Sequence, residues 1–329
     1  MRFALSGEQR QFAASLHELL SAVDTPAATR AWARGRHEPG LELWHRLAGL
    51  GVLDLLDPGT GAEPPDVAVA FEALGYHAVP GPLVESMVVA PVLSQGNGEI
   101  VTVLAPPEVP VALDADIAGL ILRLRDGRAA RVEAAELDRI RSIDPARRLF
   151  RVRGGREVPM EGGGDRPAAK AFDYAVLAVA AQLVGAGQWL LDTAVEYARR
   201  RSQYGRPIGQ YQAIKHLLAD VVTRLEFARP LVYGAAVALQ DAENRAGAVR
   251  SGTVRWGTLT RDVSAAKVAA GEAAYLAART ALQVHGAIGY TAEHDLGLWL
   301  TKVRALVGAW GGAGFHRGRV LAALRSEAP

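Results

Sequence analysis

A run of three arginines precedes glycine and polar residues that could bind a phosphate-bearing cofactor. Residues 197–216 read YARRRSQYGRPIGQYQAIKH, and they include Arg201, Tyr204 and Gln212. A guanidinium group suits phosphate, because its planar set of donors matches the phosphate oxygens. An isolated arginine run is more simply the solvated end of a helix, where cations favour the negative end of the dipole. The tyrosine, glycine, proline and glutamine that follow favour the cofactor interpretation.

A second segment, residues 283–295, reads QVHGAIGYTAEHD. Gly286 would let the backbone approach a ligand closely, because glycine has no side chain to keep it away. Gly286 could equally be a plain helix cap, and Gln283 could be a polar residue at a helix end. The presence of both segments in one chain favours a shared cofactor site.

Other kinds of chemistry are excluded by what the chain lacks. Its 329 residues include no cysteine, which excludes a disulfide framework, a thiolate zinc site and a cysteine nucleophile. The histidines His216, His285, His294 and His316 do not follow a metal-ligand spacing, so we predict no metal site. The formal net charge of +2 argues against a nucleic-acid-binding surface, which needs a concentrated basic excess.

The elements that position these segments are predominantly helical. Near the N-terminus, Ser6 and Gln9 fit a capping box, and apolar stripes follow over residues 12–20, 41–50 and 67–74. The chain is helical again from about residue 172 to the C-terminus.

Between the helical parts lies a short β-prone region. We predict strands over residues 100–105, 109–113, 117–124 and 149–152, with a hairpin turn at Asp126-Gly127 and a loop over residues 161–167.

The charge-free stretch over residues 174–191 just reaches the length of a membrane-span candidate. It contains Gln182 and Gln188, and Asp173 and Asp192 flank it, so we predict a buried helix of a soluble bundle and no membrane association. The first residues show no secretory signal, which predicts a cytoplasmic protein.

In this order and separation, residues 197–220 and 283–295 closely resemble the C-terminal domain of acyl-CoA dehydrogenases. Residues 44–52 and 72–75 resemble the helical N-terminal domain of that family, and the resemblance weakens sharply between about 100 and 165. It implies a mostly α fold in three parts. These are an N-terminal helical domain (1–98), a shortened middle β domain (99–165) and a C-terminal four-helix bundle (166–329).

The family oxidises the α,β bond of acyl-CoA thioesters: a glutamate takes the α-proton, and FAD accepts the β-hydride. Each FAD lies across a subunit interface, and the neighbour's C-terminal domain surrounds the diphosphate and adenosine. The resemblance implies that Arg201 pairs with the diphosphate. The other residues that it assigns to the cofactor are Gln203, Tyr204, Gln212, Gln283, Gly286 and Ala287.

The family's catalytic glutamate is missing from this sequence. Counting along the chain places Trp310 at one known position of that base and Ala175 at the other, and neither side chain can take a proton. Asp173 is close in sequence, but a two-residue offset on a helix points it elsewhere. Trp310 would fill the acyl slot, or simply pack into the bundle.

The flavin-ring segments of the family are also not found between residues 100 and 165, although a divergent loop could hide them.

The sequence therefore predicts the smaller, non-catalytic subunit of a heteromeric acyl-CoA dehydrogenase, in an α2β2 heterotetramer. A larger catalytic subunit would supply the base and hold most of the acyl-CoA, and an electron-transfer flavoprotein would accept the electrons. Paired actinobacterial dehydrogenases suggest steroid side-chain CoA thioesters as substrates, by analogy. Two alternatives stay open: a flavin-free scaffold protein, and a self-sufficient homo-oligomeric enzyme whose base is Glu293 or Asp295.

Overall fold

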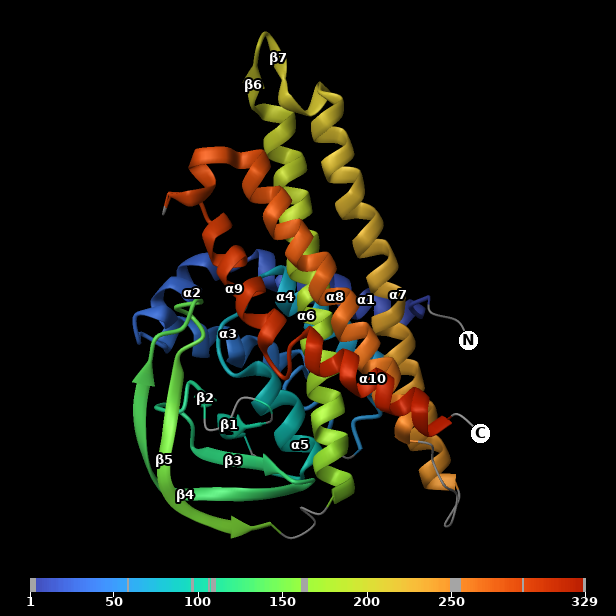
Figure 1. Ribbon diagram of the computed structural model, residues 1–329. Coiled ribbons are helices and arrows are strands. Elements are labelled where there is room, and N and C mark those ends of the chain that lie inside the picture. The colour runs from blue at the N-terminus through green and yellow to red at the C-terminus, as the bar shows by residue number, and fades with distance from the viewer. Residues whose placement is uncertain are drawn as a thin grey trace.

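The computed structural model describes residues 4–57, 59–95, 98–105, 107, 111–160, 165–248, 256–291 and 293–327. The fold is mostly helical with a small middle sheet, as predicted. In Figure 1 the long C-terminal helices rise above the rest of the molecule, and the sheet lies below and to the left of them.

The N-terminal part is built from helices of moderate length. These are α1 (Gly7–Ser21), α2 (Thr25–Ala33), α3 (Glu38–Gly49), α4 (Pro64–Tyr76), a π-helical turn η1 (Glu85–Val89) and the short α5 (Ala90–Val92). The predicted capping box is present, with the Gln9 amide N–H donating to Ser6 Oγ at 3.1 Å. Helix α2 was not predicted, and it begins where the Asp24 side chain accepts the amide N–H of Ala27 at 2.9 Å.

The middle sheet has five strands in the order β1-β3-β4-β5-β2. They are β1 (Val101–Leu104), β2 (Val111–Leu113), β3 (Leu120–Arg125), β4 (Arg128–Ile140) and β5 (Leu149–Pro159). Strands β1 and β3 are parallel, and the other neighbours are antiparallel. The predicted turn is confirmed, because Asp126 (φ +50°) and Gly127 (φ +74°) join β3 to β4.

The observed sheet is larger than the one predicted from the sequence. Most side chains of β4 and β5 are exposed, so neither strand carries a continuous apolar pattern, and only the first four residues of β5 were predicted. Residues 109 and 110 of one predicted strand lie outside the described residues. The same holds for residues 161–164 of the predicted loop, and α6 already begins at Asp165.

The C-terminal part contains the longest helices. They are α6 (Asp165–Arg200), α7 (Gln212–Ala248), α8 (Trp256–His285), α9 (Leu296–Gly308) and α10 (Ala313–Glu327), with the short 3-10 turns η2 (Ile208–Gln210) and η3 (Gly286–Tyr290). Helices α6, α7 and α8 pack on one another, and α10 packs on α8. The strands β6 (Ser202–Gln203) and β7 (Arg206–Pro207) form a hairpin at the tip of α6 (Figure 1).

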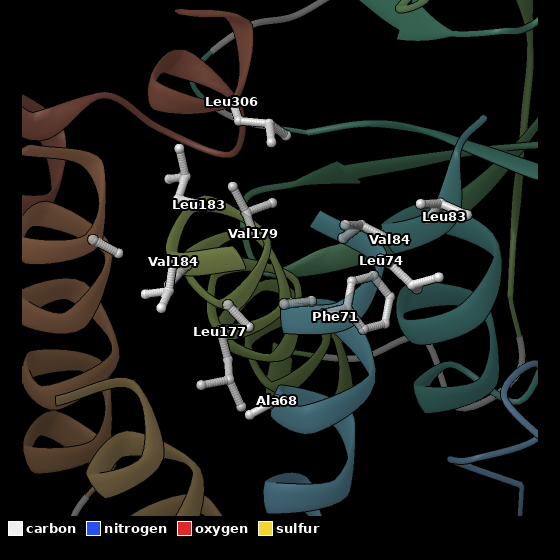
Figure 2. Packing of buried hydrophobic residues seen from close by; sticks show 14 of the residues in the cluster. Ala68, Phe71, Leu74, Leu83, Val84, Leu177, Val179, Leu183, Val184 and Leu306 are labelled. Atoms are coloured by element: carbon white, nitrogen blue, oxygen red, sulfur yellow. The ribbon is translucent and has the colours of Figure 1, made fainter. Parts of the chain in front are cut away.

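One hydrophobic core connects the N-terminal helices, β1 and β3, and the C-terminal helices. In Figure 2, Phe71 and Leu74 of α4 lie on one side of α6, and Val184 of α6 points to the other side, toward the C-terminal helices. Helix α6 is long and apolar enough to cross a membrane, but 89% of its most apolar window is buried inside the protein. The prediction of a buried core helix is therefore confirmed.

Candidate functional site

The first motif forms a projecting hairpin. Helix α6 ends at Arg200, and the chain turns at Tyr204 (φ +52°) and Gly205 (φ +81°). Positive φ at both central residues is the mark of a type I′ turn, whose twist matches that of the two flanking strands. The hydroxyl of Tyr211 donates to the carbonyl oxygen of Gln203 at 3.0 Å, and the Arg206 guanidinium lies 4.2 Å from the Tyr211 ring centre. The hairpin is thus held by its own side chains.

The second motif forms the turn after α8. Gly286 has φ +64°, which ends the α-helix, and residues 286–290 continue as η3. The ring of His285 is buried at this helix end, and its Nδ1–H donates to the carbonyl oxygen of Ala281 at 2.7 Å. Burial lowers the pKa of His285, so the ring is neutral near pH 7.

The structure brings the two motifs together at one end of the bundle. Tyr197, the first residue of the first motif, stacks on His285 of the second, with ring centres 4.4 Å apart. Because these rings belong to α6 and α8, which pack side by side, they fix the hairpin's base against the η3 turn.

Most of the residues assigned to the cofactor are exposed at this end. Arg201, Gln203, Tyr204, Gln212, Gln283 and Ala287 are exposed, and Gly286 is half-buried. Within the described part of the chain, the side chains of Arg201, Gln212 and Gln283 make no hydrogen bond or ion pair. Their polar groups therefore remain available to a molecule outside the chain.

The alternative explanation of the arginine run fits two of its three members. Arg200 pairs with Glu196 one turn earlier, and Arg199 lines a groove of about 600 Å³ between α6 and α7. Both are ordinary exposed residues of a helix end. Arg201 differs, because it lies past the end of α6, at the start of the hairpin.

Trp310 lies in the turn between α9 and α10, with its side chain buried. Its backbone has φ +58°, and its indole Nε1–H donates to Glu85 Oε1 at 3.3 Å. The indole meets Phe172 edge-on, with ring centres 5.7 Å apart, and Phe172 in turn contacts Phe315. Trp310, Phe172 and Phe315 therefore form a row of aromatic rings in contact at this position.

Two buried basic side chains hold the turn that carries Trp310. Nζ of Lys267 donates to the carbonyl oxygens of Leu306 (3.1 Å) and Val307 (3.0 Å) at the end of α9. Nε2–H of His316 donates to the Trp310 carbonyl at 3.0 Å, so Nδ1 accepts from the Ser264 hydroxyl. Burial, with a smaller contribution from Lys267, lowers the pKa of His316 to about 4 and keeps the ring neutral.

The second predicted base position offers no proton acceptor either. Ala175 is fully buried in α6. Asp173 is also buried, but its carboxylate is occupied by the Arg319 guanidinium at 2.6 Å and by the Thr260 hydroxyl at 3.0 Å. Asp173 is therefore a structural ion-pair partner.

Glu85 is a buried carboxyl beside Trp310 that the sequence analysis did not identify. It lies in η1, and burial raises its pKa despite the attraction of Arg147. The signal that could have found it is one acidic residue at the start of an apolar run that continues with Met87, Val88 and Val89. Perturbed carboxyls of this kind and π-helical turns both occur often at functional sites.

The two carboxylates considered as alternative bases lie elsewhere. Asp295 pairs with Arg30 of α2, and Glu293 is exposed. Both precede α9, whose 13 residues span about 20 Å before Trp310 is reached.

A small apolar pocket of about 210 Å³ lies next to Phe172 and Phe315. Phe172, Phe315 and Arg319 line it together with the turn between β3 and β4. Its volume is below the range of about 300–1,000 Å³ that is usual for small-molecule sites.

Comparison with known sequences gives matches over most of the chain. Residues 162–324 match the family model described as "Acyl-CoA dehydrogenase, C-terminal domain". The chain is 29% identical to acyl-CoA dehydrogenase IpdE2 of Mycobacterium tuberculosis over 314 residues, which cover 90% of each protein.

Solved structures share the fold. The ChsE4-ChsE5 complex of Mycobacterium tuberculosis contains a chain that superposes with a TM-score of 0.81 at 23% identity and covers 100% of both chains. A structure described as the Tcur3481-Tcur3483 steroid ACAD gives a TM-score of 0.81 at 20% identity, covering 97% of this chain and 98% of the other.

Proposed function

The chain belongs to the acyl-CoA dehydrogenase family, and from that premise we propose that it is the smaller, non-catalytic subunit of a heteromeric FAD-dependent member. A larger subunit would carry the base and hold most of the acyl-CoA. This chain would complete the larger subunit's FAD site across the interface. The proposal includes an α2β2 assembly in the cytoplasm, with an electron-transfer flavoprotein as the acceptor.

The observation that carries the proposal is a contrast between two parts of the chain. At the bundle tip, Arg201, Gln212 and Gln283 have polar groups without partners among the described residues, and Tyr197 stacks on His285 to join the two motifs. At the predicted base positions, Trp310 and Ala175 are buried and cannot take a proton. On this proposal, the chain keeps the residues that complete the cofactor site of a neighbouring subunit, and it lacks the catalytic base that its own site would need.

The tip fits the diphosphate and adenosine half of FAD. The guanidinium of Arg201 can donate two hydrogen bonds to phosphate oxygens, and it is exposed at the base of the hairpin. The amides of Gln203, Gln212 and Gln283 offer donors and acceptors, and the backbone at Gly286 and Ala287 is open to close approach. The ring of Tyr204, 94% exposed, has a free face for stacking. Bound FAD would supply hydride acceptance, and this chain's part would be to orient and retain it.

The substrate proposed for the complex is an acyl-CoA thioester, with steroid side-chain CoA as the finer candidate. Support for the finer candidate comes from the structural neighbour described as a steroid ACAD. If this subunit binds no acyl group of its own, the larger subunit of each pair would have room for a bulky acyl group.

The first test is expression of the full chain alone and together with a larger dehydrogenase subunit encoded beside it. We expect the chain alone to be colourless and inactive, and the complex to contain FAD and to oxidise acyl-CoA. Full flavin occupancy with activity in the chain alone would contradict the proposal. A colourless and inactive complex would favour the scaffold alternative.

The second test concerns Arg201. We expect Arg201→Ala to lower the flavin-to-protein ratio of the purified complex at least about tenfold under dilution, because a charge-assisted phosphate contact is lost. The matched control is Arg200→Ala, which removes an adjacent exposed arginine that pairs with Glu196. Equal flavin content in both variants would argue against a role of Arg201 at the interface.

A further inference from the structure

A basic hollow of about 440 Å³ lies at the loop between β4 and β5. It is lined by Arg139, Ile140, Arg141, Ser142, Pro145, Arg147 and Arg148, and we call it the arginine hollow. No carboxylate belongs to this lining, and the loop's own acid, Asp144, is buried with Oδ1 on the amide N–H of Ala146 at 3.0 Å. The hollow therefore carries concentrated positive charge.

The chain neutralises little of this charge. Arg148 is 6% exposed and pairs with Asp116, with Nη1 and Oδ1 2.9 Å apart. Arg139 reaches only a neutral acceptor, the carbonyl oxygen of Ala33, at 3.4 Å. Among the residues that the structure describes, the side chains of Arg141 and Arg147 make no hydrogen bond or ion pair.

Burial disfavours the ionised form of the two acids that interact with Arg147. Arg147 attracts Glu85 and Asp114, yet burial raises the pKa of both carboxyls, that of Asp114 to about 7. The buried ammonium of Lys302 adds further positive charge, although burial lowers its pKa to about 8. Burial thus limits how far Glu85 and Asp114 compensate the charge of Arg147.

We propose that the arginine hollow binds the phosphate groups of a small anion, either inorganic diphosphate or the diphosphate of a nucleotide. Guanidinium groups offer forked donors that match phosphate oxygens, and Arg141 and Arg147 have theirs unused. The volume lies within the range usual for small-molecule sites. The structural ion pair of Arg148 with Asp116 fixes one wall, so the site is partly preorganised.

Isothermal titration of the full chain with sodium diphosphate, ADP and adenosine tests the proposal at constant ionic strength. We expect diphosphate and ADP to bind and adenosine not to bind. Arg147→Ala and, separately, the more exposed Arg141→Ala should each weaken diphosphate binding at least about tenfold. The control is Arg153→Ala, an exposed arginine of β5 that pairs with Asp138; it should bind as the unchanged chain does, and melting temperatures verify that every variant is folded.

The comparison of ligands separates the two sources of the same chemistry. Equal affinity for diphosphate and ADP supports a site that contacts phosphate alone, and tighter binding of ADP supports a nucleotide site. An absence of diphosphate binding at millimolar concentration overturns the proposal, as does an equal loss in the Arg153→Ala control. The proposal is also wrong if small anions fail to bind while Arg147→Ala weakens association with the larger subunit, since the hollow would then be a protein contact.

Discussion

At the residue scale, the hydrogen bond from Trp310 to Glu85 links a strained turn to a buried acid. A positive φ is costly for a residue with a bulky side chain, by about 1–2 kcal/mol. Here the cost is offset by burial of the indole against Phe172 and by the donor that Glu85 needs inside the protein. The pair therefore stabilises a closed arrangement at Trp310, which the sequence predicts to occupy the position of the family's base.

We expect Trp310→Phe to lower the free energy of unfolding by about 1–3 kcal/mol, because a ring remains but the buried Glu85 loses its N–H donor. In a Glu85→Leu background the same substitution should cost less, since no carboxyl needs a partner there. Urea unfolding of the two single variants and the double variant measures this coupling. Additive costs would show that the hydrogen bond contributes nothing.

A second residue-scale prediction concerns pH. Asp114 is fully buried, and burial raises its pKa from 3.8 to about 7, while Trp32 Nε1–H, donating at 3.0 Å, opposes the rise. The folded state therefore holds a proton that the unfolded state releases, and stability falls as pH rises from about 4 to about 7, by at most about 4 kcal/mol. Asp114→Asn should remove this loss.

The measurement is the difference in melting temperature between Asp114→Asn and the unchanged chain, which should be small at pH 4.5 and positive at pH 8. The control is Asp138→Asn, at an exposed position. Its difference in melting temperature from the unchanged chain should not increase between pH 4.5 and pH 8. Burial lowers the pKa of His77 and of His316 to about 4, so their contribution to the free energy of unfolding is lost as the pH falls below 6.5. Both proteins contain these histidines, so the difference in melting temperature reports on Asp114. A difference independent of pH would contradict the assignment.

At the element scale, α4 and α6 cross with their backbones almost in contact. A Cβ atom added to Gly185 would lie 1.8 Å from the carbonyl oxygen of Glu72, and one added to Gly75 would lie 2.1 Å from that of Gln182. Both obstacles are backbone atoms, which cannot swing aside. These glycines allow the N-terminal helices to be packed directly against the central helix of the C-terminal bundle.

Gly185→Ala should therefore destabilise the protein by about 2 kcal/mol or more, since one of two helices has to move. Gly271→Ala, in α8, is the matched control: its added Cβ meets only Val307 Cγ2 at 3.9 Å. It should stabilise the protein by about 0.5–1 kcal/mol, because alanine is the better helix former. Denaturant unfolding measures both, and two changes of the same sign would contradict the close crossing.

The elements differ in how far the sequence could reveal them. The capping box at Ser6 and the turn at Asp126-Gly127 are local, so their residues alone predicted them correctly. Strands β4 and β5 depend on pairing with each other, and their exposed faces hide the alternation that marks a strand.

The candidate site divides in the same way. The structure brings the two motifs to one end of the bundle, where Tyr197 contacts His285, and their joint use in a cofactor site stays a prediction. The contact between Glu85 and Trp310 could not be predicted, because only the tertiary fold brings these distant residues together. The arginine hollow is lined by the single segment 139–148, and its arginines were not predicted as a site because only the folded loop gives them a common hollow. The roles of Arg201, Gln212 and Gln283 stay predictions.

At the scale of the whole molecule, the chain behaves as one body around a shared core. The boundaries at residues 98 and 165 stay proposals, and the largest cluster of buried side chains crosses both. Among the described residues, a second and smaller cluster, which includes Leu104, Val132 and Phe150, belongs to the middle region.

We therefore expect a single cooperative unfolding transition in calorimetry, with equal calorimetric and van't Hoff enthalpies, because no part can lose its packing without exposing the others. A separate early transition would show that the middle sheet unfolds independently. Hydrogen exchange can then assign such a transition to β3, β4 and β5.

The hairpin of β6 and β7 has a kinetic consequence. Its type I′ turn and the Tyr211 hydroxyl shape it within the chain itself, so it need not fold when the subunits meet. On the proposed arrangement, such a rigid arm would close over the flavin as the complex assembles. The cofactor could then leave only after the subunits separate, so its residence time would follow the dissociation rate of the complex rather than the strength of any single contact.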